Sequence, residues 1–577
     1  MLNSKIYKTE NVKSRFLSGK NQTTKGILLS ILFASMYLQT MSQNYCITNQ
    51  FNFGGSENEH AYSIIKIADG YVMCGSTNSH DGNFNVPHNH DVDAFIAKFD
   101  FNNNLIWQHT YGGKDWDDFV SIKSTDDGGF IAAGWTSSNE YDVSGNHGGK
   151  ADVWVVKFNS LGILQWQRCY GGKGVDRPEE IHVVLGGYQV VGSTTSNNNG
   201  DVPANRGGED AWLLTISTSG NVVSSYCYGG SGDDLMTGIS RNANGTSTFN
   251  AHTGSNDGQV SGNHGGIWDL WLVNIDNNTG NINWQKCIGG SGKENPHTIV
   301  RTADGNIVLT ITSSSSDGDF IGTTSGCAAG FTAKLMKVNP ETGAVIWNRS
   351  YPDASRCTTP FGALVTTDGG ILIMGLVTVN LIESNHDGYV FKVDDNGNML
   401  WDKILGGSKS DNVVFYKTGI EINNQYLIPF TSHSRDGDIL NPLGGADCWM
   451  VTLGTGCSQG LATEIENILP NEVVIAKLRS HELGVDEIEN NLSNGVAIFP
   501  NPFTSATTIS FSIRQTANVS VNIFDSSGRW IKTLANGDFA KGKHYLEWNA
   551  TDVEAGVYLM QFQSGKNLQT EKFIVTK

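Results

Sequence analysis

Residues 112–170 read GGKDWDDFVSIKSTDDGGFIAAGWTSSNEYDVSGNHGGKADVWVVKFNSLGILQWQRCY. This stretch decides the fold, because copies of it follow one another along the chain and a pair of glycines opens nearly every copy. The first glycines of successive pairs lie 58 to 60 residues apart, except for one interval of 117. The pairs are Gly54-Gly55, Gly112-Gly113, Gly171-Gly172, Gly229-Gly230, Gly289-Gly290 and Gly406-Gly407. A fixed period of this length indicates one supersecondary unit that is stacked repeatedly, because a single copy cannot bury its own apolar faces.

The interval of 117 residues contains a degenerate copy. Trp347 and Tyr351 keep the register of the repeat there, but Pro352-Asp353 stand where the glycine pair is expected. With this copy included, the sequence predicts seven units, the last of which ends near Cys457.

Each copy predicts four short strands. In the quoted stretch, apolar and polar residues alternate between turn-forming Asp, Asn and Gly, which places strands at Asp118–Ser124, Phe130–Thr136, Asp152–Phe158 and Ile163–Tyr170. A long polar loop, 137–151, separates the second strand from the third. Such a unit is an antiparallel meander, so the repeat region is predicted to be all-β.

The third strand of each copy is apolar on both faces, as in Trp154-Val155-Val156 and Trp212-Leu213-Leu214. A sheet with one face in water would alternate apolar and polar side chains. Two buried faces fit four-stranded blades that each pack against a neighbour on both sides. The sequence therefore predicts a seven-bladed β-propeller, and the main alternative, a β-helix, has turns shorter than this period.

The two ends of the repeat region are predicted to meet. Tyr45–Phe53 reads as a lone fourth strand, and the last copy ends after its third strand, Trp449–Leu453. If the N-terminal strand completes the last blade, the ring closes on itself and Cys46 comes close to Cys457. We therefore expect a disulfide between Cys46 and Cys457, and a second between Cys327 and Cys357 in the irregular copy.

The first 43 residues are predicted to be a secretory signal peptide. Six basic residues precede a 13-residue apolar run, Gly26–Leu38, which is too short to cross a hydrocarbon core of about 30 Å. A buried core helix or a membrane anchor is the alternative. No other long apolar run follows, so the mature chain is expected to have no transmembrane segment and to contain the propeller at 44–457.

The composition is acidic, with 57 Asp and Glu against 39 Lys and Arg and a formal net charge of −18. This balance argues against nucleic acid as a partner, because phosphate contacts need clustered Lys and Arg. The sequence contains no H-E-x-x-H motif and no complete phosphate-binding G-x-x-x-x-G-K-[ST] motif. These observations favour a protein that is not an enzyme, without deciding the question, and no cofactor is predicted apart from a possible Ca²⁺.

The long loops and the Gly-Gly connections are expected to share one rim of the ring, where polar residues gather. Their carboxylates and amide oxygens suit Ca²⁺ or the hydroxyls of a sugar, assisted by Trp116 and Trp135. The alternative is that Asp and Asn before Gly form Asx turns that only organise the loops. The candidate ligand-binding residues are Asp117, Asp118, Asp142, Asn146, His147, Asp233, Asp234, Asp257, Asn263 and His264.

Two resemblances extend this interpretation. Thr342–Trp347 and Thr279–Trp284 resemble the T-G-x-x-x-W repeat of quinoprotein dehydrogenase-like β-propellers, which supports the fold and implies no cofactor here. Residues 496–577 resemble the type A sorting domain of the Bacteroidetes type IX secretion system, whose motif residues match Pro500, Asn501, Pro502, Gly528, Arg529, Gly556, Tyr558 and Lys577.

The second resemblance implies a small Ig-like β-sandwich that is recognised by the type IX secretion machinery. Residues 458–495, rich in Glu, are then an acidic linker. The protein is expected to pass through the periplasm and to be secreted or held at the outer-membrane surface. The leading functional hypothesis is a propeller that binds a glycan or a surface protein on its long-loop rim. The alternatives are an extracellular enzyme, hydrolase or quinoprotein-like, with its site at the central rim cavity, and a spacer with no small ligand.

Overall fold

The structure is a computed structural model of the chain, which divides into two compact units, Met1–Ser458 and Gln459–Lys577. The residues that it describes are 45–84, 92–148, 150–321, 330–351, 356–380, 385–412, 419–440, 442–443, 445–455, 497–499, 505–513, 516–525, 529–550, 553–564 and 567–576. The predicted signal peptide and linker lie outside these residues, as do Cys327, Cys457, Pro500, Asn501, Pro502, Gly528 and Lys577. In the described part of the chain, no helix has the length and hydropathy needed to cross a bilayer.

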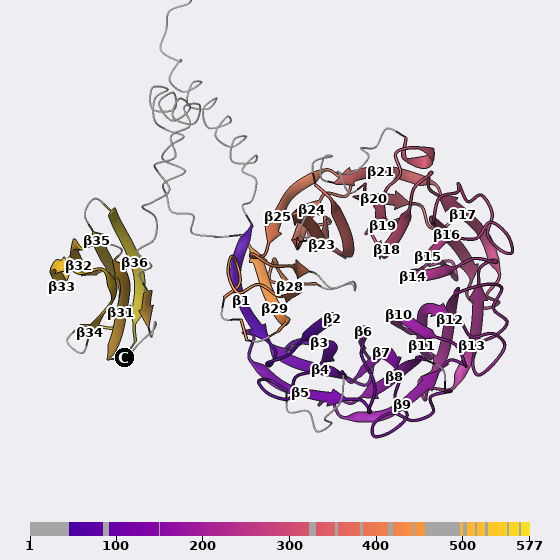
Figure 1. Ribbon diagram of the computed structural model, residues 1–577, viewed down its shortest axis with the longest axis horizontal. Helices are drawn as coiled ribbons and strands as arrows, with labels where there is room; N and C mark the ends of the chain where they lie inside the picture. The colour runs from indigo at the N-terminus through magenta and orange to yellow at the C-terminus, as the bar shows by residue number, and fades with distance from the viewer. Residues whose placement is uncertain are drawn as a thin grey trace, which may run out of the picture. The chain divides into compact units, whose positions relative to one another are not determined.

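The first unit is a seven-bladed β-propeller (Figure 1). The first strand of each blade lies toward the centre of the ring and the fourth strand lies outermost. Blades 1 to 3 are β2 (Glu59–Ile67), β3 (Gly70–Thr77), β4 (Asp93–Asp100) and β5 (Leu105–Tyr111); β6 (Ser121–Ser124), β7 (Phe130–Thr136), β8 (Asp152–Phe158) and β9 (Leu164–Tyr170); and β10 (Asp176–Val184), β11 (Gly187–Thr194), β12 (Asp210–Ser217) and β13 (Val222–Tyr228).

The next three blades repeat this order, and a short 3-10 helix, η1 (Gly318–Phe320), follows β19. They are β14 (Asp234–Arg241), β15 (Thr246–Thr253), β16 (Asp269–Asp276) and β17 (Ile282–Ile288); β18 (Glu294–Arg301), β19 (Ile307–Ser313), β20 (Thr332–Val338) and β21 (Val345–Tyr351); and β22 (Thr358–Val365), β23 (Ile371–Asn380), β24 (Asn385–Val393) and β25 (Met399–Leu405).

Blade 7 closes the ring with strands from both ends of the propeller. It contains β26 (Asp411–Asn412), β27 (Ile420–Ile422), β28 (Gln425–Ser432) and β29 (Asp447–Gly454), and its outer strand is β1 (Cys46–Phe53). The strand β1 runs antiparallel to β29, with Cys46 opposite Gly454 and Phe53 opposite Cys448. The expected closure is therefore confirmed.

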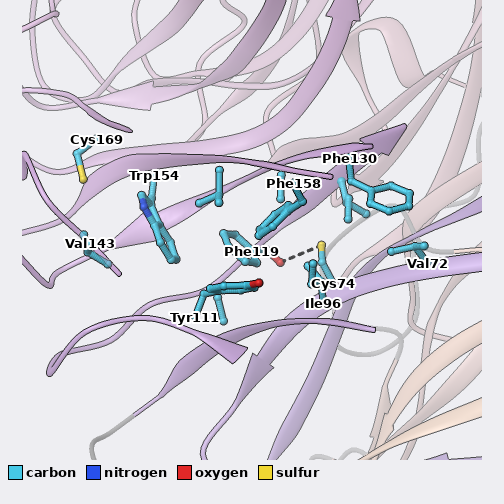
Figure 2. Close-up of a cluster of buried hydrophobic side chains, with 14 residues drawn as sticks. Val72, Cys74, Ile96, Tyr111, Phe119, Phe130, Val143, Trp154, Phe158 and Cys169 are labelled. Carbon is cyan, nitrogen blue, oxygen red and sulfur yellow. Dashed lines mark hydrogen bonds between the residues drawn. The ribbon is translucent and has the colours of Figure 1, made fainter. Parts of the chain in front are cut away.

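The third strands are buried on both faces because blades pack on either side of them. All seven residues of β8 are buried, and its Trp154 stacks on Phe119 with ring centroids 4.9 Å apart. Figure 2 shows this cluster, which joins Tyr111 and Ile96 of blade 1 to Trp154 and Phe158 of blade 2. Each such cluster buries large aromatic side chains, which makes burial of apolar area between blades the main term that holds the ring together.

The first strand of blade 2 begins later than the alternation of its residues predicts, at Ser121 instead of Asp118. The reason is an extra residue before Ser121: Asp117 pairs with Thr136 and Ser121 with Ala133, so four residue steps on this strand face three on its partner. Matching register shifts occur in the first strands of other blades, for example between Pro178 and Glu180. This β-bulge interrupts the ladder, and the alternation of side chains cannot show it.

The cysteines fall into two groups. Free, buried thiols within the described residues are Cys74, Cys169, Cys227, Cys287 and Cys448. Cys46 and Cys357 are disulfide-bonded. Their expected partners, Cys457 and Cys327, lie outside the described residues, so the two pairings stay predictions.

The second unit is a small β-sandwich of the Ig-like kind. One sheet has the order β30-β31-β34 and the other β33-β32-β35-β36. Their shared core includes Trp548, Tyr558 and Phe573. The strands are β30 (Ala497–Phe499), β31 (Ala506–Ile513), β32 (Ala517–Asp525), β33 (Trp530–Phe539), β34 (Gly542–Asn549), β35 (Gly556–Ser564) and β36 (Asn567–Val575). Arg529 pairs with Asp525, at 2.9 Å from Nε to Oδ2.

Candidate functional site

Two buried carboxylates flank the first glycine of each Gly-Gly pair. One comes from the start of the third strand of a blade and the other from the first strand of the next blade. A Cβ on Gly229 would lie 2.6 Å from Asp210 Oδ1 and 2.6 Å from Asp234 Oδ2. The same arrangement holds for Asp93 and Asp117, Asp152 and Asp176, Asp269 and Glu294, Asp387 and Asp411, and Asp447 and Glu59. Glycine recurs at these positions because any side chain would collide with both carboxylates.

The carboxylate on the first strand fastens the Gly-Gly loop to the end of the second strand. Asp234 Oδ2 accepts hydrogen bonds from the Gly230 amide (2.7 Å) and the Ser255 hydroxyl (2.7 Å), while Thr253 donates to its other oxygen. Asp117 Oδ2 likewise accepts from Gly113 N and Ser138 Oγ. Asp117 and Asp234, both candidate ligand residues, thus stabilise the connections between blades.

The irregular junction between blades 5 and 6 supports this explanation. Thr332 and Thr358 occupy the two carboxylate positions, and both hydroxyls donate to the carbonyl oxygen of Tyr351, at 3.3 and 2.8 Å. The sequence has Pro352-Asp353 there in place of two glycines. This junction therefore lacks both the two carboxylates and the two glycines. The recurring glycine pairs of the sequence thus go with the buried carboxylates at the other junctions.

His147 and His264 each bind an aspartate of their own blade. His147 Nδ1 lies 2.6 Å from Asp152 Oδ2, and its Nε2 lies 3.7 Å from Asp201 Oδ2 of the next blade. His264 repeats the arrangement, at 2.8 Å from Asp269 and 3.5 Å from Asp319. Sequence reasoning missed these partners, although the five-residue spacing from each histidine to its aspartate recurs and could have revealed the first contact.

The remaining candidate residues make contacts within the loops. Asp142 Oδ2 accepts a long hydrogen bond from Gly112 N (3.4 Å), and Asp257 Oδ1 accepts one from Ser231 N (2.7 Å). Asp233 Oδ1 accepts from Glu209 N. The side chains of Asn146 and Asn263 accept from Gly148 N and Gly265 N, respectively. The ten candidates are thus distributed over the rim at blades 2 and 4 instead of converging on one point, and their role as ligand contacts stays a prediction.

Burial raises the pKa of several of the carboxyl groups on this rim toward 7. It raises the pKa of Asp118 to about 8, that of Asp117 to about 6, and that of Asp210 to about 6. Burial together with the nearby carboxylates of Asp117 and Asp142 raises the pKa of Asp93 to about 7. These carboxyl groups can therefore hold protons near neutral pH.

Across the described ranges, no group of three or more His, Cys, Asp or Glu side chains is placed to hold a metal ion. The possible Ca²⁺ therefore gains no support here.

A different surface distinguishes blade 2 from the other blades. Trp116 follows the Gly-Gly pair, is 46% exposed, and stacks on Trp135 with ring centroids 5.5 Å apart. The guanidinium carbon of Arg177, from blade 3, lies 5.8 Å from the centre of the Trp135 ring. At the position of Trp116 the other glycine-opened copies have Asn58, Val175, Asp233, Lys293 and Ser410. The repeat therefore does not require an aromatic residue there.

The comparisons with known proteins identify the second unit. Residues 497–576 match the family model described as "Secretion system C-terminal sorting domain". The chain thus carries a sorting domain for export by a type IX secretion system, which places the protein outside the cell or on its surface. No curated protein has a sequence that matches this chain.

Three solved structures with a similar fold share little sequence with the chain. A puromycin hydrolase is 9% identical, with a TM-score of 0.39, and the similarity covers 80% of this chain and 59% of that one. A fungal alcohol oxidase is 9% identical, with 92% and 99% covered and a TM-score of 0.34. PorZ of Porphyromonas gingivalis, a surface component of the type-IX secretion system, is 12% identical, with 92% and 75% covered and a TM-score of 0.18.

Proposed function

We propose that this protein is a secreted or cell-surface β-propeller that binds a saccharide on the surface formed by Trp116, Trp135 and Arg177. The observation that carries the proposal is the large exposed area of Trp116, which stacks on Trp135 at a position where the repeat does not call for an aromatic residue. An exposed tryptophan that the fold does not need is typical of a binding surface.

The chemistry of this surface suits a sugar. The indole ring of Trp116 offers a flat apolar area for the C–H face of a pyranose ring, and Trp135 behind it fixes its orientation. Arg177 is exposed and presents guanidinium donors next to this area. An apolar face with polar groups at its edge is the usual composition of a small-ligand site.

The two carboxyl groups that follow Trp116 in the sequence, Asp117 and Asp118, are buried and bonded within the propeller. Asp117 is fully buried and accepts hydrogen bonds from Gly113 N and Ser138 Oγ. Asp118 is 3% exposed, and its Oδ1 accepts from Trp135 N at 3.3 Å. A general acid or base has to reach the reacting atom of the substrate, and both groups face the frame of the propeller instead.

A glycan array tests the proposal with the secreted protein. Wild-type protein is expected to bind at least one saccharide, and Trp116→Ala is expected to weaken that binding about tenfold or more, because one face of the ligand loses its apolar contact. Trp268→Ala is the matched control: Trp268 also lies on this rim, but it is contacted by His252 (4.6 Å between ring centroids) and by Lys293 (4.2 Å from Nζ to the ring).

The control variant should bind as the wild type does. Equal losses in the Trp116 and Trp268 variants, or a wild-type protein that binds no saccharide on the array, would refute the proposed site.

A further inference from the structure

Tyr141 has a backbone conformation that residues other than glycine rarely adopt. Its backbone φ is +59°, in the left-handed region, and its side chain is 59% exposed. At the matched position of five other blades the residue is glycine, with φ between +60° and +68°: Gly82, Gly200, Gly258, Gly318 and Gly437. A bulky residue in this region is strained, whereas glycine is not.

The frame of the propeller imposes this conformation whatever residue is present. Asp142 N donates to Gly112 O at 3.2 Å, just as Asp201 N donates to Gly171 O at 2.8 Å in the next blade. Lys114 N donates to Glu140 Oε1 at 2.9 Å, which repeats the bond from Ser231 N to Asp257 Oδ1 in blade 4. The loop therefore keeps its shape without a tyrosine, and a strained, exposed aromatic residue there points to a role outside the fold.

Tyr141 and Trp116 belong to a group of aromatic and cationic side chains on blade 2 and the start of blade 3. The Lys114 ammonium lies 5.8 Å from the centre of the Tyr141 ring. Trp116 comes two residues after Lys114 and stacks on Trp135, which Arg177 also contacts. The acidic side chains beside this group include Asp115, which is exposed, Glu140, which is held by Lys114 N, and Asp118, which is buried and interacts electrostatically with Arg177. On a chain whose net charge is −18, two cations next to exposed aromatic rings form a distinct local environment.

We infer that Tyr141 and Lys114 extend the Trp116 surface and that the ligand is a linear acidic saccharide. Its sugar rings would lie on Tyr141 and Trp116, and its carboxylate or sulfate groups would pair with Lys114 and Arg177. Aromatic faces supply apolar contact, and the ammonium and guanidinium groups supply charge-assisted hydrogen bonds to the anionic groups. This inference rests on the proposed function, because it names the class of saccharide that the same surface takes.

The experiment compares charged and uncharged forms of the same chain. The secreted protein is titrated with hexamers of galacturonate and with their methyl esters, and with sulfated and desulfated hexamers of glucosamine. A charged form should bind at least tenfold more tightly than its uncharged counterpart, and the difference should shrink as salt is added. Lys114→Gln should weaken binding of the charged form severalfold more than it weakens binding of the uncharged form.

The variant Tyr141→Gly separates a ligand role from a structural one. It restores the residue that five other blades carry, so the melting temperature should stay the same or rise. Affinity for the charged hexamer should nevertheless fall about tenfold, because one stacking surface is lost. Tyr141→Phe keeps the ring and should keep most of the affinity.

Three results would overturn the inference: a fall in melting temperature for Tyr141→Gly, unchanged affinity in that variant, or equal binding of charged and uncharged forms. Trp116-dependent binding of neutral saccharides alone would end the inference and leave the proposed function standing. If no saccharide binds at all, both fail together.

Discussion

Gly229→Ala is expected to destabilise the propeller by about 3 kcal/mol, because the new methyl group enters an occupied space. Its carbon would lie 2.6 Å from Asp210 Oδ1 and 2.6 Å from Asp234 Oδ2, well inside van der Waals contact. The Asp234 carboxylate cannot retreat without breaking its hydrogen bonds to Gly230 N and Ser255 Oγ. Differential scanning calorimetry of the propeller transition should show a fall of about 5 °C or more.

The irregular junction supplies the control for this variant. If the two carboxylates are the obstacle, Gly229→Ala should cost at least about 1 kcal/mol less in a chain that also carries Asp210→Thr and Asp234→Thr. That background copies the arrangement of Thr332 and Thr358 found elsewhere in the same chain. An identical cost in both backgrounds would show that the glycine is needed for another reason.

The stability of the propeller is expected to rise as the pH is lowered from 8 to about 5. Burial raises the pKa of Asp210 to about 6 and that of Asp387 to about 6, while burial with its carboxylate neighbours raises that of Asp93 to about 7. Between about pH 4 and pH 7 the folded chain therefore holds protons that the unfolded chain has released, so the free energy of unfolding falls as the pH rises. A shift of about 2 pKa units corresponds to about 3 kcal/mol for one group, as an upper bound.

The gain is expected to end near pH 4, where other carboxylates oppose it. A hydrogen bond from Lys157 holds the pKa of Asp127 at about 2, so the stability from that pair is lost in strong acid. Melting temperatures measured between pH 4 and pH 8 should therefore rise toward the acidic end of this range. A melting temperature that rises steadily from pH 5 to pH 8 would contradict the account.

Asp210→Asn tests whether the junction carboxyls cause this pH dependence. Asp210 Oδ1 is buried and has no hydrogen-bond partner among the described residues, and Asp234 Oδ2 faces the same glycine. An amide in place of the carboxyl can donate there as a protonated acid would, without titrating. The variant should be at least as stable as the wild type at pH 8, with a smaller dependence of its melting temperature on pH. Marked destabilisation at pH 8 with an unchanged slope would argue against the carboxyl pair.

The architecture could be predicted from the sequence because its determinants are periodic. Seven blades follow from the glycine pairs and the apolar third strands. The pairing of β1 with β29 follows from the incomplete unit at each end of the repeat region. The bulge between Asp117 and Ser121 could not be predicted, because an extra residue in one strand leaves the alternation of its neighbours almost unchanged. Register details of this kind depend on the opposite strand, not on local sequence.

The contacts of the rim side chains were harder to predict from the sequence, because the two residues of each contact come from different blades. Asp210 and Asp234 meet only after two blades have packed, and His147 approaches Asp201 across the same kind of boundary. The unusual position of Tyr141, by contrast, could have been found by aligning the copies, since Asp-Gly or Asn-Gly stands there in five of them. Residues that every blade repeats serve the frame, and residues that one blade alone carries are the better candidates for function.

The most direct test of this account is hydrogen exchange with and without the saccharide that binds best on the array. We predict slower exchange of amides in 113–118 and 137–148 of blade 2, and no change in the matched segments 290–295 and 314–321 of blade 5. The two sets of loops share the same junction hydrogen bonds, for example Gly113 N to Asp117 and Gly290 N to Glu294, and differ in their exposed side chains. Slower exchange in both sets, or in the blade 5 segments alone, would contradict a ligand surface on blade 2.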